Sequence, residues 1–456
     1  MAAGTTRALA RLTPLALYGA LALPLYLAFA LLTPPFETPD EHQHVFRAWQ
    51  LASGQVLAQR RGAASGGLVP AGLVVATTTE LGNARPHDVR RPQQSSWSER
   101  WTRRTPVDQG HRVFADFPGS ASYAPAGYGP QVLAVRVGRA FDLSVEDHVR
   151  LGRAFNALFT FALFIAALRV LPTGRLVLLA VGLMPMTAAC AGSYGQDGPI
   201  IAACAGLVAL GLRAVGERRF ARPATLATIA LALFVTLAKI VYLPLTAAGL
   251  FAGSRPGRLR IAWPPLVATA AAVVALGGWL TLNAGAIVPL MPGVPSPGAQ
   301  LALVVHHPAS FLAALRFSYG LHGWQVLLGN VFRFGWLDVG PVSAALAATC
   351  AAFVLAVWFG DDGVALPAAW RAWALGLTAA IVLLLALIFY LTATPLGAGF
   401  IGGLQGRYYI PALLPLGLAL VPRRRSHEPG IALLVALLLV VADLAALHAI
   451  VAAFYT

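Results

Sequence analysis

The residues best suited to acid–base chemistry follow the first apolar segment, in the stretch Thr33-Pro-Pro-Phe-Glu-Thr-Pro-Asp-Glu-His-Gln-His44. Only 11% of the chain is charged and 58% is hydrophobic, so acids and imidazoles gathered beside an apolar segment predict chemistry at a membrane surface. A carboxylate can act as a general base, and Asp40 and Glu41 are the candidates. The plainer alternative is a helix start, in which Thr38 caps a helix and both acids lie in its first turn, near the positive end of the dipole. His44 would then be a surface or supporting residue.

Four further charged residues are candidates for a binding site. Lys239 is the only lysine of the chain, and it and Arg407 are cations able to hold a phosphate. Asp197 and Asp338 could take part in the same site, although each could also simply cap the helix that follows it. A snorkelling side chain is the plainer alternative for Lys239, and an interface anchor is the plainer alternative for Arg407.

The composition predicts an integral membrane protein. The mean hydropathy is +0.70 over 456 residues, and several apolar windows exceed the length needed to cross a bilayer. The net charge of +15 would suggest nucleic acid in a soluble protein, but much of the excess lies in short loops between apolar segments. The positive-inside rule explains it more simply, so we expect no nucleic-acid partner.

Hydropathy and the arginines of the short loops predict an all-α, polytopic fold with about eleven transmembrane helices in a single membrane domain over residues 1–456. The expected order is a first helix at 12–32, a first external loop at 33–146, six helices over 148–283, a second external loop at 284–339 and four helices over 341–454. The N-terminus would be cytoplasmic. Residues 59–112, rich in arginine, follow no clear pattern.

One apolar segment, 225–251, is too long for a single straight crossing. Arginines precede it at 213–222 and follow it at 255–260. If both clusters are cytoplasmic, the chain must turn back near 239–244. Broken helices at membrane depth are tolerated only where they face protein or a watery cavity, so this turn is predicted to line a site.

Six segments in order resemble the DUF2142 family of bacterial predicted membrane proteins. They are Pro39-Asp-Glu-His-Gln-His with Phe46-Arg-Ala-Trp-Gln50, Tyr123-Ala-Pro with Tyr128-Gly-Pro-Gln131, Leu151-Gly-Arg-Ala-Phe-Asn156, Lys239-Ile-Val-Tyr-Leu-Pro244, Gly335-Trp-Leu-Asp338, and Leu404-Gln-Gly-Arg-Tyr-Tyr-Ile-Pro411. Where relatives read Ser-Tyr-Asp, this chain has Ser193-Tyr-Gly-Gln-Asp197, with the acid displaced by two positions.

That family is similar to the GT-C glycosyltransferases, which take a sugar from a polyprenyl-phosphate donor. The resemblance implies an inverting transfer to a glycan or lipid acceptor of the cell envelope, on the periplasmic side of the bacterial inner membrane. Asp40 or Glu41 would be the base, Lys239 and Arg407 would bind the donor phosphate, and a divalent cation such as Mg or Mn is a possible cofactor. The residues expected to bind substrate or support the site are His44, Arg47, Tyr123, Tyr128, Asp197, Tyr242, Trp336, Asp338, Gln405 and Tyr408.

Two other functions fit the same residues. A transporter or flippase of lipid-linked sugars would be favoured by inverted-repeat halves and by cavity-lining charges on both membrane sides. The sequence shows no such halves, and its unusual charges are expected on one side only. A non-catalytic subunit of an envelope polysaccharide assembly is the third possibility, in which substituting the acids would leave sugar transfer intact.

Overall fold

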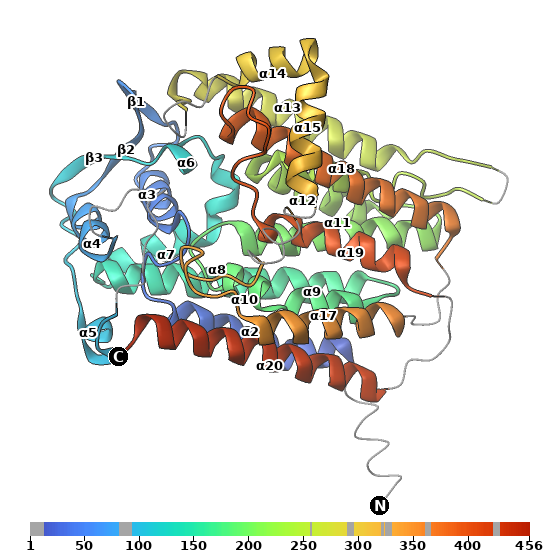
Figure 1. Ribbon diagram of the computed structural model, residues 1–456, viewed down its shortest axis with the longest axis horizontal. Coiled ribbons are helices and arrows are strands. Elements are labelled where there is room, and N and C mark those ends of the chain that lie inside the picture. Colours follow the sequence, from blue (N-terminus) through green and yellow to red (C-terminus); the bar gives the residue numbers. More distant parts are fainter. Residues whose placement is uncertain are drawn as a thin grey trace, which may run out of the picture.

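The computed structural model describes residues 13–81, 94–255, 258–289, 296–320, 323, 331–360, 366–422 and 429–456. Long helices lie side by side and form a bundle, and a smaller cap of short helices and strands covers one end of it, at the left of Figure 1. The bundle comprises α2 (Pro14–Leu32), α8 (Val145–Val170), α9 (Arg175–Leu183), α10 (Pro185–Ala191), α11 (Asp197–Glu217), α12 (Arg222–Ala238), α13 (Trp263–Asn283), α17 (Ser343–Trp358), α18 (Ala368–Ala393), α19 (Ile410–Leu420) and α20 (Pro429–Phe454).

The helix ends follow from local sequence. The hydroxyl of Thr13 accepts a hydrogen bond from the amide of Ala16 at the start of α2, and the Thr33-Pro34-Pro35 sequence ends the helix. Ser144 caps α8 in the same way through the amide of Asp147. Pro185 separates α9 from α10, so this part of the predicted helical region 148–283 forms two short helices.

Within the part of the chain that the structure describes, six helices are long and apolar enough to cross a membrane. They are α2, α8, α11, α13, α18 and α20, and the bent pair α14 (Pro297–His306) and α15 (Pro308–Tyr319) would make a seventh. This agrees with a polytopic, all-α membrane protein. The predicted total of eleven crossings is not supported on this measure, because α9, α10, α12, α17 and α19 have at most 17 residues.

The chain reverses where the sequence predicts a broken helix. After α12 ends at Ala238, Lys239 adopts an extended conformation and η2 (Ile240–Ala247) runs back. Gly249 then lies against Phe220, which precedes α12 in sequence, so the two ends of the reversal are neighbours. Lys239 is therefore at the tip of this turn, as predicted.

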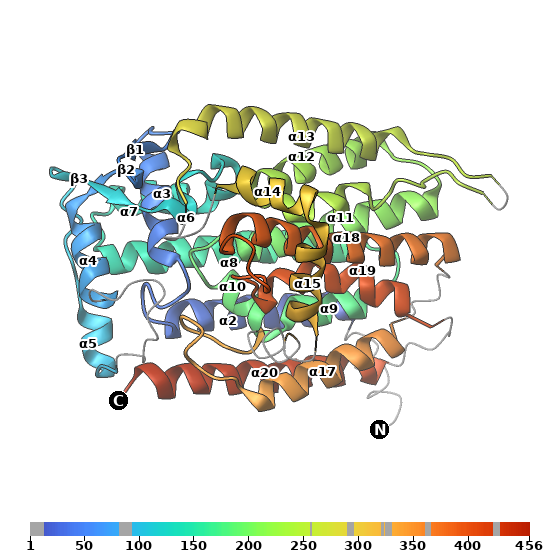
Figure 2. The same cartoon turned by 45° about the horizontal axis from the view of Figure 1, so that its top comes forward.

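The cap is formed largely by the segment 33–146, which the sequence predicts to be the first external loop. A three-stranded antiparallel sheet forms in the order β1 (Gln59–Arg61), β2 (Ala64–Pro70), β3 (Arg112–Asp116). The remaining elements are α3 (Glu41–Ala52), α4 (Ala71–Leu81), α5 (Trp97–Thr102), α6 (Pro118–Ala121), η1 (Pro125–Tyr128) and α7 (Gly129–Ala140), together with η3 (Ala284–Ala286) from the other loop. Figure 2 shows the cap at the same end of the bundle after rotation.

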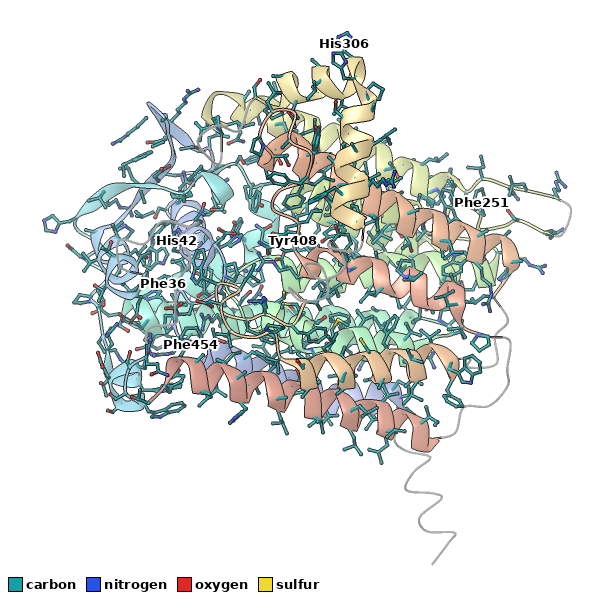
Figure 3. The ribbon with its side chains drawn as sticks, viewed as in Figure 1. Phe36, His42, Phe251, His306, Tyr408 and Phe454 are labelled. Carbon is teal, nitrogen blue, oxygen red and sulfur yellow. The ribbon has the colours of Figure 1, made fainter. Side chains whose placement is uncertain are left out.

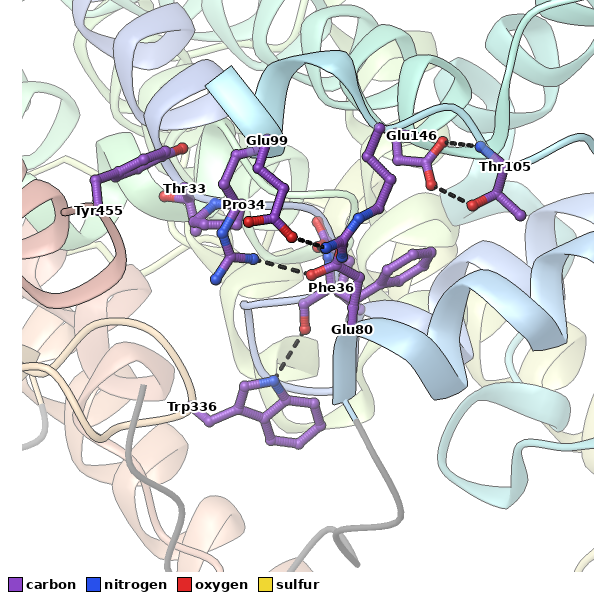
Figure 4. Close-up of polar contacts among 12 residues, drawn as sticks. Thr33, Pro34, Phe36, Glu80, Glu99, Thr105, Glu146, Trp336 and Tyr455 are labelled. Atoms are coloured by element: carbon purple, nitrogen blue, oxygen red, sulfur yellow. Dashed lines mark hydrogen bonds and ion pairs between the residues drawn. The ribbon is translucent and has the colours of Figure 1, made fainter. Parts of the chain in front are cut away.

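The arginine-rich region 59–112, for which the sequence shows no pattern, has a structural use in its described part. Glu80 of α4 forms ion pairs with Arg100 and Arg103, and Glu146 of α8 accepts hydrogen bonds from the amide and hydroxyl of Thr105 at 2.8 and 2.6 Å (Figure 4). These contacts join α4 and α5 to the start of α8. The arginines therefore hold α4 and α5 together within the cap, and Thr105 fastens the cap to the bundle.

Candidate functional site

A cavity lies between the cap and the bundle, with about 80 Å³ of free space, enough for several water-sized groups. Its wall comes from segments far apart in sequence. The polar and charged side chains among the lining residues are Thr33, Thr38, Asp40, His44, Tyr123, Ser193, Gln196, Asp197, Lys239, Arg333, Gln405, Arg407 and Tyr408. Tyr408 is near the centre of the molecule, with Phe36 and His42 on its cap side (Figure 3).

Asp40 lines this cavity and does not cap a helix through its side chain. The prediction that Thr38 caps the helix is wrong: α3 begins at Glu41, and Asp40 is the N-cap residue, in the left-handed conformation with φ of +61°. Its side chain makes no capping hydrogen bond, and Oδ1 accepts only a 3.3 Å bond from Gln43 among the described residues. A non-glycine residue at positive φ is costly and typical of functional sites. The carboxylate is thus held toward the cavity by backbone conformation.

The second acid, Glu41, is placed quite differently. It is fully buried, lies outside the cavity lining and pairs with Arg153, whose Nε and Nη2 donate at 2.7 and 2.5 Å. Glu41 also accepts from the amides of Phe36 and Tyr194. Arg153 in turn donates to the carbonyls of Ala30, Thr33 and Pro34. With these contacts the pair joins the loop after α2 to α8 and to the segment before α11, which is a structural role.

Three charged side chains predicted from the sequence meet in the cavity wall. The carboxylate of Asp197 pairs with the ammonium of Lys239, and its other oxygen is 3.3 Å from Nε of Arg407. The ring of Tyr408 lies beneath both cations, with its centroid 4.3 Å from Nζ of Lys239 and 5.2 Å from Cζ of Arg407. Both are within the range of a cation–π contact. Two cations share one carboxylate, so the cluster carries a net charge of about +1.

Asp197 is also the first residue of α11, where a carboxylate is favoured by the helix dipole. The N-cap residue is Gln196 and no side chain caps this end, so the alternative that Asp197 caps α11 is wrong. Tyr242 lies outside the lining and donates from its hydroxyl to the carbonyl of Tyr408 at 2.9 Å. It thereby fixes the turn that presents Arg407.

The segment before α11 is held by two polar side chains from motifs that the sequence singles out. Gln131 of α7 donates to the side chain of Asn156 and to the carbonyl of Tyr194. Asn156 donates to the carbonyls of Ser193 and Gly195 at 2.9 and 3.1 Å. Neither side chain lines the cavity. They position the backbone that carries Asp197.

His44 and Tyr123 form the cap side of the cavity. Nδ1 of His44 is 2.8 Å from the hydroxyl of Tyr128, which is itself buried outside the lining. Burial lowers the pKa of His44 to about 4, against the opposing effect of the nearby Asp40 and Asp197 carboxylates. Burial likewise raises the pKa of Tyr123 to about 12. At neutral pH both side chains are therefore uncharged.

Arg47, another residue expected to support the site, is fully buried and does not line the cavity. Its guanidinium donates to the carbonyl of Tyr123 at 2.7 Å and to the carbonyl of Val56 at 2.9 Å. Burial lowers its pKa to about 10, so it remains charged at neutral pH. Its role is to hold Tyr123 in place.

The segment 331–342, in the second of the two predicted loops, contributes a tight turn in which Phe334 and Val339 exchange backbone hydrogen bonds. The indole of Trp336 donates to the carbonyl of Phe36 at 2.9 Å, which fastens this turn to the segment before Asp40 (Figure 4). Trp336 and Asp338 are in the turn but outside the lining. The lining residues here are Arg333, Phe334, Gly335 and Leu337.

The sequence analysis does not predict five of the polar lining residues, which are Thr33, Thr38, Ser193, Gln196 and Arg333. Arg333 lies two residues before the Gly335-Trp-Leu-Asp338 motif, and a charged residue so close to it was the available signal. Gln196 directly precedes Asp197, and neither its amide oxygen nor its nitrogen has a hydrogen-bond partner among the described residues, although Gln196 is only 1% exposed. Oε1 of Gln405, which was predicted, is also buried and has no partner in the described part of the chain. Buried amides of this kind are costly unless a ligand or water satisfies them.

The described residues gather no group of three or more His, Cys, Asp or Glu side chains able to hold a metal ion, so no ligands are assigned to the expected divalent cation.

Comparisons with known proteins give one finding. The profile of the family described as "Predicted membrane protein (DUF2142)" matches residues 23–416, which include every lining residue of the cavity except Ile450. Neither the characterised proteins nor the solved structures include a significant match. The match covers most of the chain, and the chain therefore belongs to the DUF2142 family of predicted membrane proteins.

Proposed function

We propose that this protein is a glycosyltransferase of the GT-C type, which moves a sugar from a polyprenyl-phosphate donor to a glycan or lipid acceptor. One observation supports it above the others. Asp40, from the segment after α2, lines the same cavity as Lys239 and Arg407, which come from two later turns. A carboxylate base opposite a pair of cations is what the transfer of a sugar from a phosphate requires.

In the proposed reaction, the hydroxyl oxygen of the acceptor attacks the anomeric carbon of the donor while its proton moves to Asp40. The bond between that carbon and the phosphate oxygen breaks, and its electron pair leaves with the phosphate. The polyprenyl phosphate departs as a dianion, and the configuration at the sugar inverts. Lys239 and Arg407 stabilise the charge that develops on the leaving oxygen.

The surroundings of the cavity suit such a substrate. The amide of Gln196 and Oε1 of Gln405 have no hydrogen-bond partner among the described residues, and they offer a donor and acceptors, as sugar hydroxyls require. Tyr123 and Tyr408 provide aromatic faces. A lipid-linked donor needs a membrane protein, and α11 and α20, two of the candidate membrane helices, contribute Asp197 and Ile450 to the cavity lining. The same proposal places the N-terminus in the cytoplasm and the cavity on the periplasmic side of a bacterial inner membrane.

The test uses a strain lacking the gene, complemented with wild type, Asp40→Asn or Asp142→Asn. Asp142 is a matched control because it is exposed and also has positive φ, of +48°, outside the cavity. Asparagine tolerates this conformation, so neither variant should misfold. We expect the surface glycans of the strain with Asp40→Asn to lack one sugar unit in mass spectrometry. The glycans of the strain with Asp142→Asn should retain this unit.

The purified proteins separate an enzyme from a transporter. With a polyprenyl-phosphate sugar and an acceptor in detergent, only an enzyme releases free polyprenyl phosphate. Release by wild type and by Asp142→Asn but not by Asp40→Asn supports the proposal. Full release by Asp40→Asn refutes the assignment of the base, and no release by wild type favours the transporter or the non-catalytic subunit.

A further inference from the structure

Arg333 is a third cation in the cavity wall, contributed by the second external loop. Within the described part of the chain it forms no ion pair, and its Nη1 donates to the carbonyl of Leu337 at 3.3 Å. The cluster of Lys239 and Arg407 is different, because Asp197 already neutralises part of its charge. Arg333 therefore brings a charge that no described carboxylate balances.

The turn that carries Arg333 is held rigidly and under strain. Leu337, whose carbonyl receives the guanidinium, has a φ of +67°, and the backbone bridge between Phe334 and Val339 closes the turn around it. The bond from Trp336 to Phe36 links the turn to the segment that leads into Asp40. Strain in a supported turn is typical of residues that must be presented to a ligand.

The charges of the cavity lining balance one phosphate group. Lys239, Arg407 and Arg333 supply three positive charges, and Asp197 and Asp40 supply two negative ones, since His44 is neutral at pH 7. The sum of +1 matches the single negative charge of a phosphodiester donor. The lining and the bound donor together therefore carry no net charge. After transfer, the leaving phosphate carries about two negative charges and Asp40 has gained a proton, so the total charge of lining and phosphate is again zero. A diphosphate donor would leave excess negative charge.

We propose that Arg333 binds the donor phosphate together with Lys239 and Arg407, and that these three cations select a monophosphate-linked lipid over a diphosphate-linked one. This inference rests on the proposed function. Without Arg333 the lining would be neutral before the donor binds. The guanidinium fork can form two parallel hydrogen bonds to phosphate oxygens, which an ammonium cannot.

The test measures the binding of three probes to the full-length purified protein in detergent: farnesyl phosphate, farnesyl diphosphate and uncharged farnesol. We expect wild type to bind farnesyl phosphate at least tenfold more tightly than farnesol and more tightly than the diphosphate. Arg333→Gln should weaken the binding of farnesyl phosphate about tenfold and leave the binding of farnesol unchanged. Arg316→Gln is the matched control, because Arg316 is exposed on α15 outside the lining. The affinity of this variant for farnesyl phosphate should stay within twofold of that of wild type.

The outcomes separate this inference from the proposed function. If Arg333→Gln binds farnesyl phosphate like wild type while Lys239→Gln does not, Arg333 is not part of the phosphate site and the proposed donor site stands. If none of the substitutions at 239, 333 and 407 changes the preference for farnesyl phosphate over farnesol, the donor site itself is refuted. Tighter binding of the diphosphate refutes the selection.

A second variant keeps the test decisive if Arg333→Gln does not fold. Arg333→His allows the charge to be switched in one protein by pH. Between pH 7.5 and 5.5, the affinity of Arg333→His for farnesyl phosphate should rise several-fold more than the affinity of wild type or of Arg316→His. The same pH dependence as wild type would overturn the role of Arg333.

Discussion

Glu41 and Arg153, which are 112 residues apart in sequence, form an ion pair whose two side chains are both fully buried. The neighbouring acid, Asp40, lines the cavity instead. Two adjacent carboxylates that look equivalent in the sequence therefore have separate uses. Glu41 supports the assembly of the site, and Asp40 faces the cavity in which the reaction would take place.

This difference predicts opposite effects of removing the two charges. Glu41→Gln leaves Arg153 buried without its counter-ion, which typically costs about 3–5 kcal/mol. We expect a large fall in the melting temperature measured in detergent. Glu146→Gln is a useful comparison, because Glu146 is also buried but bonds to Thr105 and not to a buried arginine. The melting temperature of Glu146→Gln should therefore fall less than that of Glu41→Gln. Glu41→Gln with wild-type stability and no turnover would instead make Glu41 the base.

Asp40→Asn should preserve the fold and lose activity. Asparagine retains the oxygen that accepts from Gln43 and tolerates the left-handed backbone. Loss of a carboxylate base typically reduces turnover by a factor of about 10² to 10⁴. Initial rates of sugar transfer by the purified proteins, with melting temperatures measured in parallel, check this. A rate within threefold of wild type would contradict the assignment.

Asp197→Asn should strengthen the binding of an anionic ligand. The carboxylate occupies Lys239 and Arg407 in the absence of substrate, so a phosphate must compete with it. We expect about tenfold tighter binding of farnesyl phosphate and a lower melting temperature without ligand, because two buried cations then share no counter-ion.

Asp147→Asn is the control for this prediction. It too removes an acid that pairs with two arginines, Arg104 and Arg150, but it does so away from the cavity. Its affinity for farnesyl phosphate should equal that of wild type. Should Asp197→Asn lose binding altogether, Asp197 organises the cations and does not compete with the ligand.

His44 predicts a fall in stability in mild acid. Its pKa is about 4 in the folded protein, against 6.5 for the free side chain, because burial disfavours the charged form. The unfolded chain therefore takes up a proton between pH 6.5 and 4 that the native protein does not. This contribution to stability is complete above pH 6.5 and is lost as the pH falls toward 4.

Melting temperatures of wild type and His44→Gln from pH 7.5 to 4.5 check this. The fall in stability between pH 7.5 and 4.5 should be smaller in His44→Gln than in wild type, by the equivalent of about 1–2 kcal/mol. This is less than the full pKa shift would give, because the ring is partly exposed. His111→Gln, at an exposed histidine of the cap, should decline like wild type. Parallel curves for wild type and His44→Gln would show that His44 is not held neutral.

The proposed orientation predicts which loops are accessible from outside the cell. Cysteine introduced at Gln109 in the cap should react with a membrane-impermeant maleimide in intact spheroplasts, and cysteine at Arg219, between α11 and α12, only after permeabilisation. Both positions are exposed. Cys350, which is exposed on α17, is first replaced by serine. The reverse pattern would place the cavity on the cytoplasmic side.

Local signals in the sequence determined much of the bundle. Long runs of apolar residues correspond to α2, α8, α11, α13, α18 and α20, and a proline closely follows α2, α8 and α18. The arginines on both sides of 225–251 required the turn at Lys239. These features depend on neighbours in the chain, because hydrophobic length and proline act within a few residues. The membership of the family, carried by short motifs, was accessible in the same way.

The tertiary structure alone decided how those motifs divide their work. Arg153, Gln131 and Asn156 belong to the motifs as much as Asp40 does, yet their hydrogen bonds go to distant backbone and not into the cavity. The pairing of Glu41 with Arg153 joins residues more than a hundred positions apart. Such a contact leaves no local periodicity or spacing in the sequence, so only the folded chain shows which of the two acids lines the cavity with the cations.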